Sequence, residues 1–154
     1  MNNKKVKNAE EHIYNGIKFK SGLEVTAYQM LTEENLNPRY EPCTFSILEG
    51  KKFSVPFYDL HNDRKLKKNV WGLNTYKVQA IKYTPDFIFY ITDSSGAERM
   101  IVIEAKGFPN DRYAYVKKMF LAHLEQYYPE SMFFEVHNQR QLKAAIEIIK
   151  SIKQ

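Results

Sequence analysis

The sequence contains a single cysteine, Cys43, so one chain cannot form a disulfide bond within itself. That scarcity is typical of a reducing compartment such as the cytoplasm. No apolar run approaches the roughly 18 residues that read as a membrane-spanning helix. The polar stretch at residues 1–11 also lacks the apolar centre of a signal peptide. We therefore expect a cytoplasmic protein that has no membrane partner.

Net charge is low as well: 23 Lys and Arg residues stand against 18 Asp and Glu residues, which leaves +5. This excess indicates a polyanionic partner only weakly. Hydrophobic residues make up 44% of the 154-residue chain, which excludes a disordered composition and predicts one sizeable core. We expect a polar N-terminal arm at residues 1–20, followed by a single domain at residues 21–154.

Two carboxylates come together in one predicted β-hairpin. The apolar runs at residues 87–91 and 100–103 flank a turn that contains Gly96. If residues 94–96 form the loop, with Gly96 left-handed, then Asp86 faces Glu104 across the two strands. Carboxylates in facing positions destabilise a sheet by up to about 1 kcal/mol, and a divalent cation would offset that repulsion. Lys106 lies two residues beyond Glu104 and therefore on the same face.

A pair of carboxylates beside an ammonium group is suited to metal-assisted hydrolysis of a phosphodiester. Oxygen ligands favour Mg²⁺, and Mn²⁺ can replace it. The alternative is a pair of solvated carboxylates with Lys106 as a plain ion-pair partner. In a catalytic site Lys106 would orient or deprotonate the attacking water, or stabilise charge on the phosphorane. The sequence does not separate these roles.

Glu24 has a structural explanation. The run Ser21-Gly22-Leu23-Glu24 predicts a helix start in which Ser21 is the N-cap and Glu24 closes a capping box. The spacing alone therefore favours a structural Glu24. The four histidines show no metal-ligand spacing.

The remaining pattern predicts an α/β domain in which helices flank a mixed sheet. Helices are expected at residues 111–127 and after Asn138, with a strand at residues 132–136 parallel to the one before it. Short strands are expected at residues 40–48 and 53–57, around a turn at Glu49-Gly50.

Residues 58–75 show no clear period and are expected to form a loop, as part of a basic insertion at about residues 58–77. Their cationic side chains, together with the aromatic Trp71 and Tyr76, are suited to contacting phosphates and stacking on bases. A solvated loop is the alternative. The candidate nucleic-acid contacts are Arg64, Lys65, Lys67 and Lys68 of this insertion, and Lys117 of the helix expected at residues 111–127.

Thr84-Pro85-Asp86 followed by Glu104-Ala105-Lys106 resembles the signature of the PD-(D/E)xK, or restriction-endonuclease-like, nucleases. Residues 16–137 more broadly resemble phage-type endonuclease I, a family that resolves Holliday junctions, and a family of small phage-encoded proteins. Ser21-Gly22-Leu23-Glu24, Tyr83 to Phe87 and Tyr128-Pro129-Glu130 contribute to that likeness.

The resemblance implies a restriction-endonuclease-like fold and a Mg²⁺-dependent DNA endonuclease that acts on branched DNA. It implies that Asp86, Glu104, Glu24 and the carbonyl of Ala105 bind the metal and that Lys106 is catalytic. It also implies a homodimer, in a bacterium or a phage-infected host cell. The longer stretch at residues 49–77 leaves junction specificity open. A nucleic-acid-binding or assembly module without turnover and an RNA-directed nuclease are the alternatives.

Overall fold

The computed structural model describes residues 12–107 and 111–153. The chain divides into two compact units, one of which is inserted in the sequence of the other. The first unit combines Met1–Thr44 with Thr84–Gln154, and the second is Phe45–Tyr83. The elements of the first unit are β1 (His12–Tyr14), β2 (Ile17–Phe19), α1 (Gly22–Glu33), β3 (Arg39–Tyr40), β8 (Phe87–Thr92), β9 (Glu98–Ala105), α2 (Asp111–Tyr127), β10 (Met132–Val136) and α3 (Gln139–Lys153).

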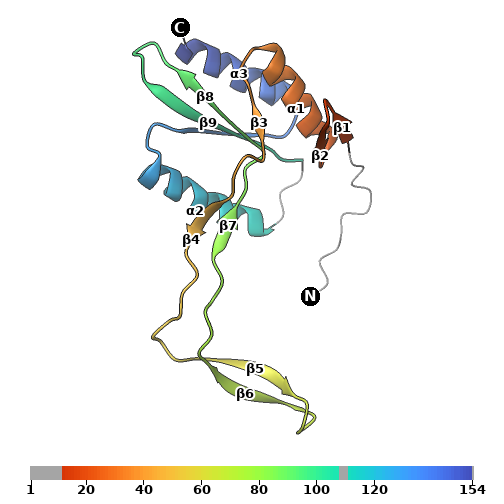
Figure 1. The fold of residues 1–154 in the computed structure, drawn as a ribbon, viewed down its shortest axis with the longest axis vertical. Coiled ribbons are helices and arrows are strands. Elements are labelled where there is room, and N and C mark those ends of the chain that lie inside the picture. The colour runs from red at the N-terminus through yellow and green to blue at the C-terminus, as the bar shows by residue number, and fades with distance from the viewer. Residues whose placement is uncertain (1–11, 108–110, 154) are drawn as a thin grey trace. The chain divides into compact units, whose positions relative to one another are not determined.

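A four-stranded mixed sheet with the order β10-β9-β8-β3 forms the centre of the first unit (Figure 1). β9 runs antiparallel to β8 and parallel to β10. The expected α/β class, the mixed sheet and the parallel β9-α2-β10 unit are therefore confirmed.

The β8–β9 hairpin has the expected register, in which Ile88 pairs with Val102 and Tyr90 with Met100. Gly96 is left-handed (φ +86°), as the turn requires. Asp93 stabilises the turn by accepting hydrogen bonds from the backbone amides of Ser95 and Ala97, both at 2.9 Å. This register places the residue before β8 opposite the end of β9.

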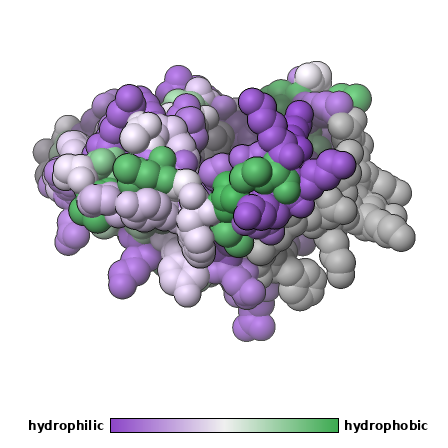
Figure 2. Space-filling model, turned by 90° about the horizontal axis from the view of Figure 1, so that it is seen from below, coloured by the Kyte–Doolittle hydropathy of each residue, from purple (hydrophilic) through white to green (hydrophobic). Residues whose placement is uncertain are grey.

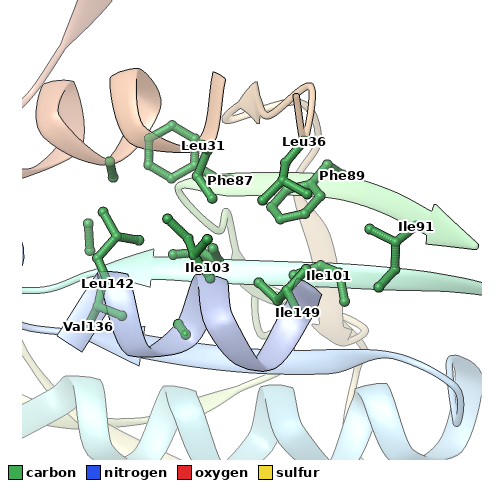
Figure 3. Packing of buried hydrophobic residues seen from close by; sticks show 14 of the residues in the cluster. Leu31, Leu36, Phe87, Phe89, Ile91, Ile101, Ile103, Val136, Leu142 and Ile149 are labelled. Carbon is green, nitrogen blue, oxygen red and sulfur yellow. The ribbon is translucent and has the colours of Figure 1, made fainter. Parts of the chain in front are cut away.

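One face of the sheet packs against α1 and α3 (Figure 3). Phe87 and Phe89 of β8 and Ile101 and Ile103 of β9 alternate along their strands, and all four side chains are at most 2% exposed. The helices contribute Ala27 and Leu31 from α1 and Leu142, Ala145, Ile146 and Ile149 from α3.

The other face of the sheet packs against α2. The rings of Phe120 on α2 and Phe133 on β10 meet edge to face, with centroids 6.0 Å apart. Tyr113 and Leu124 are buried on the same side of α2, whereas Tyr127 at its end is 59% exposed. Because side chains alternate along a strand, Val102 and Glu104 share this α2 face.

Part of the expected N-terminal arm is ordered. Residues 12–19 form a hairpin in which β1 pairs with β2, and Phe19 is fully buried against Tyr40 and Phe87. The turn Asn15-Gly16 is left-handed at both residues, which is the geometry of a two-residue hairpin. The rest of the arm, residues 1–11, lies outside the described residues.

The second unit consists of β4 (Phe45–Leu48), β5 (Phe57–Asp63), β6 (Lys68–Asn74) and β7 (Ile81–Tyr83). β4 pairs with β7, so the strands expected at residues 40–48 and 53–57 do not form a hairpin around Glu49-Gly50. Gly50 is a site of close approach instead, because a Cβ there would lie 2.8 Å from the backbone of Val78 and Ala80. The expectation of a loop at residues 58–75 is also wrong, because β5 and β6 pair over seven positions.

The molecular surface seen in Figure 2 mixes hydrophobic patches with hydrophilic side chains. Among the residues that the structure describes, no helix has the length and apolar character needed to cross a membrane.

Candidate metal centre

Asp86 lies where the pairing of β8 and β9 ends. Its Oδ2 atom accepts a hydrogen bond of 2.7 Å from the backbone amide of Ala105, so a side chain continues the ladder beyond Phe87. Asp86 and Glu104 are both buried, with 9% and 3% of their residue surface exposed. The register thus brings two buried carboxyl groups to the same end of the hairpin.

Asp86 lies in an environment that disfavours its negative charge. Burial raises the pKa of Asp86 to about 8, and the charges of Glu104 and Glu24 add to that rise. The Ala105 amide and the Lys106 ammonium oppose the rise without cancelling it. A cation at this position would relieve the repulsion, and carboxylate oxygens are the ligands that Mg²⁺ and Mn²⁺ prefer. The donor set therefore fits a hard divalent cation.

Lys106 follows the end of β9 and lies beside Asp86 and Glu104, the two residues of the candidate metal centre. Its Nζ atom lies 3.3 Å from Glu104 Oε1 and 4.7 Å from the centroid of the Tyr113 ring. Its backbone is held by β10: the amide donates to the Val136 carbonyl at 2.8 Å, and the carbonyl lies 2.5 Å from His137 Nδ1. The ammonium is therefore positioned by two neighbouring elements, β10 and α2.

Glu24 performs the capping role that the sequence predicted and also lies near the centre. Its amide donates to Ser21 Oγ at 3.3 Å, and Ser21 Oγ donates to Glu24 Oε1 at 2.9 Å. Glu24 Oε2 accepts from the Lys20 amide at 2.9 Å and from the Tyr40 hydroxyl at 2.6 Å. The carboxylate thus receives three donors besides influencing the pKa of Asp86. With about four lone-pair positions on a carboxylate, roughly one is left for a cation.

Three residues near the carboxyl groups were missed by the sequence analysis. Burial and the bond to Glu24 raise the pKa of Tyr40 far above its usual value. Lys20 pairs with Glu41, which raises the pKa of Lys20, and the charges of Glu24 and Asp86 raise it further. The Glu41 amide also donates to the Asp86 carbonyl at 2.8 Å. The pairing of β3 with β8 would have placed these residues near Asp86, but local sequence patterns do not reveal that pairing.

Glu135 organises a second polar cluster beside Lys106. Its Oε2 atom accepts from Lys117 Nζ at 2.8 Å and from the Tyr113 hydroxyl at 2.9 Å, and its Oε1 atom lies 3.0 Å from His137 Nε2. The parallel register of β9 and β10, which the sequence did predict, pairs Glu135 with Glu104 and could have identified it. Lys117, which was expected to contact nucleic acid, has a protein partner in this cluster.

The four cationic residues expected to contact phosphates do not belong to this unit. Arg64, Lys65 and Lys67 form the turn between β5 and β6, and Lys68 begins β6. They are exposed on the second unit. The sequence-predicted set therefore separates into a centre on the first unit and a basic turn on the second.

The carboxylates are not gathered around a common point in a ready-made metal cage. Across residues 12–107 and 111–153 there is no group of three or more His, Cys, Asp or Glu side chains arranged to hold a metal ion. The hydrogen bonds explain this, because Glu24 turns toward Ser21, Lys20 and Tyr40 while Asp86 turns toward the Ala105 amide. Metal binding at this centre would require carboxylate rotation.

Comparison with known proteins finds one match, to a family model. No curated protein and no solved structure matches the chain. One family model, described as Protein of unknown function (DUF1064), matches residues 4–146, which span every element discussed above except the end of α3. The chain therefore belongs to the DUF1064 family.

Proposed function

We propose that this protein is a Mg²⁺-dependent DNA endonuclease that hydrolyses phosphodiester bonds. The observation that carries the proposal is the facing pair of buried carboxyl groups, Asp86 and Glu104, with the Lys106 ammonium 3.3 Å from Glu104. A structural role alone gives no reason to bury two carboxyl groups where their charges repel. The resemblance to PD-(D/E)xK nucleases supports the same assignment.

Asp86, Glu104 and the carbonyl of Ala105 would hold the metal, with Glu24 as a fourth ligand through its remaining lone pair. The ion would polarise a phosphoryl oxygen and lower the pKa of a bound water. Asp86 is suited to exchange a proton for a metal, because a carboxyl group with a pKa of about 8 is largely protonated at neutral pH without the cation.

Lys106 supplies the positive charge that the protein itself brings to the reaction. The Tyr113 ring lies beside the Lys106 ammonium, and the Lys106 backbone is hydrogen-bonded to Val136 and His137. Together these contacts fix the direction of the Lys106 side chain. From this position Nζ would hold the attacking water or a phosphoryl oxygen by hydrogen bonds. Tyr113 and His137 act through Lys106 and are positioning residues.

Branched DNA is the substrate that the resemblance to endonuclease I favours, and paired cuts in a four-way junction require two centres in a symmetric homodimer. The alternative from another class is a nucleic-acid-binding or assembly module without turnover. An intact acidic set beside a positioned lysine favours the enzyme, because a binding module has no need of carboxylates that repel phosphate.

The test uses labelled linear, nicked and four-way-junction DNA and a matching RNA, with Mg²⁺, Mn²⁺, Ca²⁺ or EDTA. We expect DNA cleavage with Mg²⁺ or Mn²⁺ and none with EDTA. Asp86→Asn, Glu104→Gln and Lys106→Met should each lose more than about 100-fold in rate and keep DNA affinity within a few-fold. Several kcal/mol of transition-state stabilisation correspond to a loss of at least this size.

Glu130→Gln is the matched control, because Glu130 is an exposed carboxylate that pairs with Arg99 away from the centre. It should cleave at the wild-type rate. Cleavage that persists in EDTA or in Lys106→Met would contradict the mechanism. Binding of DNA without cleavage under Mn²⁺ would favour the non-catalytic module.

A further inference from the structure

The positive charge of the chain is concentrated in the second unit. Residues 45–83 carry eight Lys and Arg against three Asp and Glu, which leaves +5. The first unit carries fifteen residues of each sign and is formally neutral. A neutral unit that also buries carboxyl groups provides little attraction for a polyanion. The excess positive charge that could attract nucleic acid therefore lies in the second unit.

The turn between β5 and β6 presents much of this charge in a defined shape. Asp63 Oδ1 accepts hydrogen bonds from the amides of Lys65 and Leu66, at 2.8 and 3.0 Å. Lys67 is left-handed (φ 49°), and the paired residues Asp63 and Lys68 close the turn. The side chains of residues 64–68 are all exposed. The basic residues thus lie at the tip of a hairpin.

The two faces of the β5–β6 hairpin differ. On one face, the side chains cover one another: the Tyr76 hydroxyl donates to Asp59 at 2.7 Å, and its ring meets Phe57 edge to face at 5.6 Å. The His61 ring lies over Gly72, where it comes within 2.4 Å of the position a Cβ would take. The hydroxyl and the ring of Tyr76 on this face therefore already have partners within the hairpin unit.

The opposite face carries Tyr58, Leu60, Trp71 and Leu73, which we call the apolar hairpin face, and the bonded pair Asn62 and Asn69 nearer the turn. Tyr58 pairs with Leu73 and Leu60 pairs with Trp71, so the four side chains lie together. They are 57%, 53%, 70% and 53% exposed. A two-stranded hairpin with one apolar face gains stability when that face is covered. The most exposed member is Trp71, the one tryptophan of the chain.

We infer that the β5–β6 hairpin is an arm that binds DNA containing unpaired bases. Its basic tip contacts phosphates, while Trp71 and Tyr58 stack on bases. Aromatic side chains beside cationic ones are the combination that binds single strands, because every base offers a flat face for stacking. The choice of DNA over other polyanions rests on the proposed function. The unpaired bases would belong to single-stranded regions or to the branch point of a junction.

The emission of Trp71 tests this inference directly, since no other tryptophan contributes. The full chain in EDTA is titrated with single-stranded DNA, duplex DNA and a four-way junction, with acrylamide as a second quencher. We expect single-stranded and junction DNA to quench Trp71 and to protect it from acrylamide, and duplex DNA to do so much less. Equal effects of duplex and single strand would overturn the stacking inference, as would unchanged emission with every DNA.

Matched variants of the aromatic and the basic residues supply the controls. Trp71→Ala should weaken binding of single-stranded DNA by about 5- to 160-fold, whereas Trp71→Phe should recover most of it. Tyr127→Ala, which removes an exposed aromatic ring from the first unit, should have no effect. Replacing Lys65, Lys67 and Lys68 by Gln should reduce the salt-dependence slope by roughly 0.7 per lost phosphate contact. The same change at Lys143, Lys150 and Lys153 on α3 should leave the slope unchanged.

The apolar hairpin face has two other conceivable partners, and the same signal identifies them. An emission that shifts with protein concentration before DNA is added would indicate a second copy of the chain. A blue shift with anionic phospholipid vesicles and no response to DNA would indicate a lipid surface. Either result would overturn the inference. Binding is measured in EDTA and cleavage with Mg²⁺ or Mn²⁺, so the two proposals can fail separately. DNA that quenches Trp71 but is never cleaved would support the hairpin as a DNA-binding element and contradict the endonuclease. DNA that is cleaved without quenching Trp71 would support the endonuclease and contradict the role of the hairpin.

Discussion

Glu104 and Glu135 occupy paired positions on the parallel strands β9 and β10, yet the protein treats their charges differently. Burial works to raise the pKa of Glu135, but bonds from Lys117 and Tyr113 outweigh it and leave the pKa below its usual value. Glu104 instead raises the pKa of Asp86 and meets Lys106 at a longer distance of 3.3 Å. We interpret Glu135 as a structural carboxylate and Glu104 as one suited to a cation.

Lys117→Met should therefore destabilise the protein by about 1–2 kcal/mol, since it leaves a half-buried carboxylate without its charged donor. Lys118→Met, at the exposed neighbouring position, should change stability by less than about 0.5 kcal/mol. Urea unfolding at pH 7 measures both. Because the pKa of Glu135 is lowered, the gap between wild type and Lys117→Met should shrink as the pH falls below about 4.5. Equal stability of the two variants would show that the pair contributes nothing.

Asp86→Asn should stabilise the metal-free protein at alkaline pH. The folded pKa of about 8 lies above the unfolded value of 3.8, so the folded state holds a proton that the unfolded state releases. Wild-type stability should therefore fall as the pH rises from about 4 to 8. The variant, which can still accept from the Ala105 amide, should lack this fall. Melting temperatures in EDTA at pH 4.5 and pH 9 measure it, and a constant difference between the two proteins would contradict the assignment.

The two roles of Glu24 separate in a pair of variants. Ser21→Ala removes the N-cap and should cost about 0.5–2 kcal/mol while cleavage stays within a few-fold of wild type. Glu24→Gln keeps a residue that serves in a capping box but removes the charge, so it should preserve stability and lose cleavage. Thermal melts and the cleavage assay together decide the matter. A fully active Glu24→Gln protein would reduce Glu24 to a cap.

The junction claim predicts a homodimer in solution that cuts four-way DNA faster than a linear duplex of the same sequence. Sedimentation velocity and competition between the two substrates test its halves separately. A monomer that nicks linear DNA equally well would preserve the endonuclease proposal and exclude junction resolution.

Local patterns predicted the elements of the first unit well. The β8–β9 register followed from the apolar runs and from Gly96, and the Ser21 cap and the Asn138 cap of α3 were both visible in the sequence. These features depend on neighbouring residues, so a single sequence contains them. The same register predicted that Asp86 would face Glu104.

The β5–β6 hairpin was missed for identifiable reasons. Its period-two pattern, with Tyr58 and Leu60 on β5 and Trp71 and Leu73 on β6, places the large apolar residues in solvent rather than in a core. Its turn uses a left-handed Lys67 where glycine or asparagine would be the usual signal. The Glu24, Tyr40 and Lys20 neighbourhood was missed because it depends on β3 joining β8, a contact between distant parts of the sequence.

The bond from the Ala105 amide to Asp86 makes one backbone hydrogen a reporter of the proposed metal centre. An amide held by a neighbouring strand exchanges with solvent deuterium only when the sheet opens, whereas this one is protected by a side chain. A carboxylate that rotates toward an ion would release it. Deuterium exchange at Ala105 should then quicken when the metal binds while exchange at Ile101 and Ile103 slows, so one peptide map would record occupancy and stability with opposite signs.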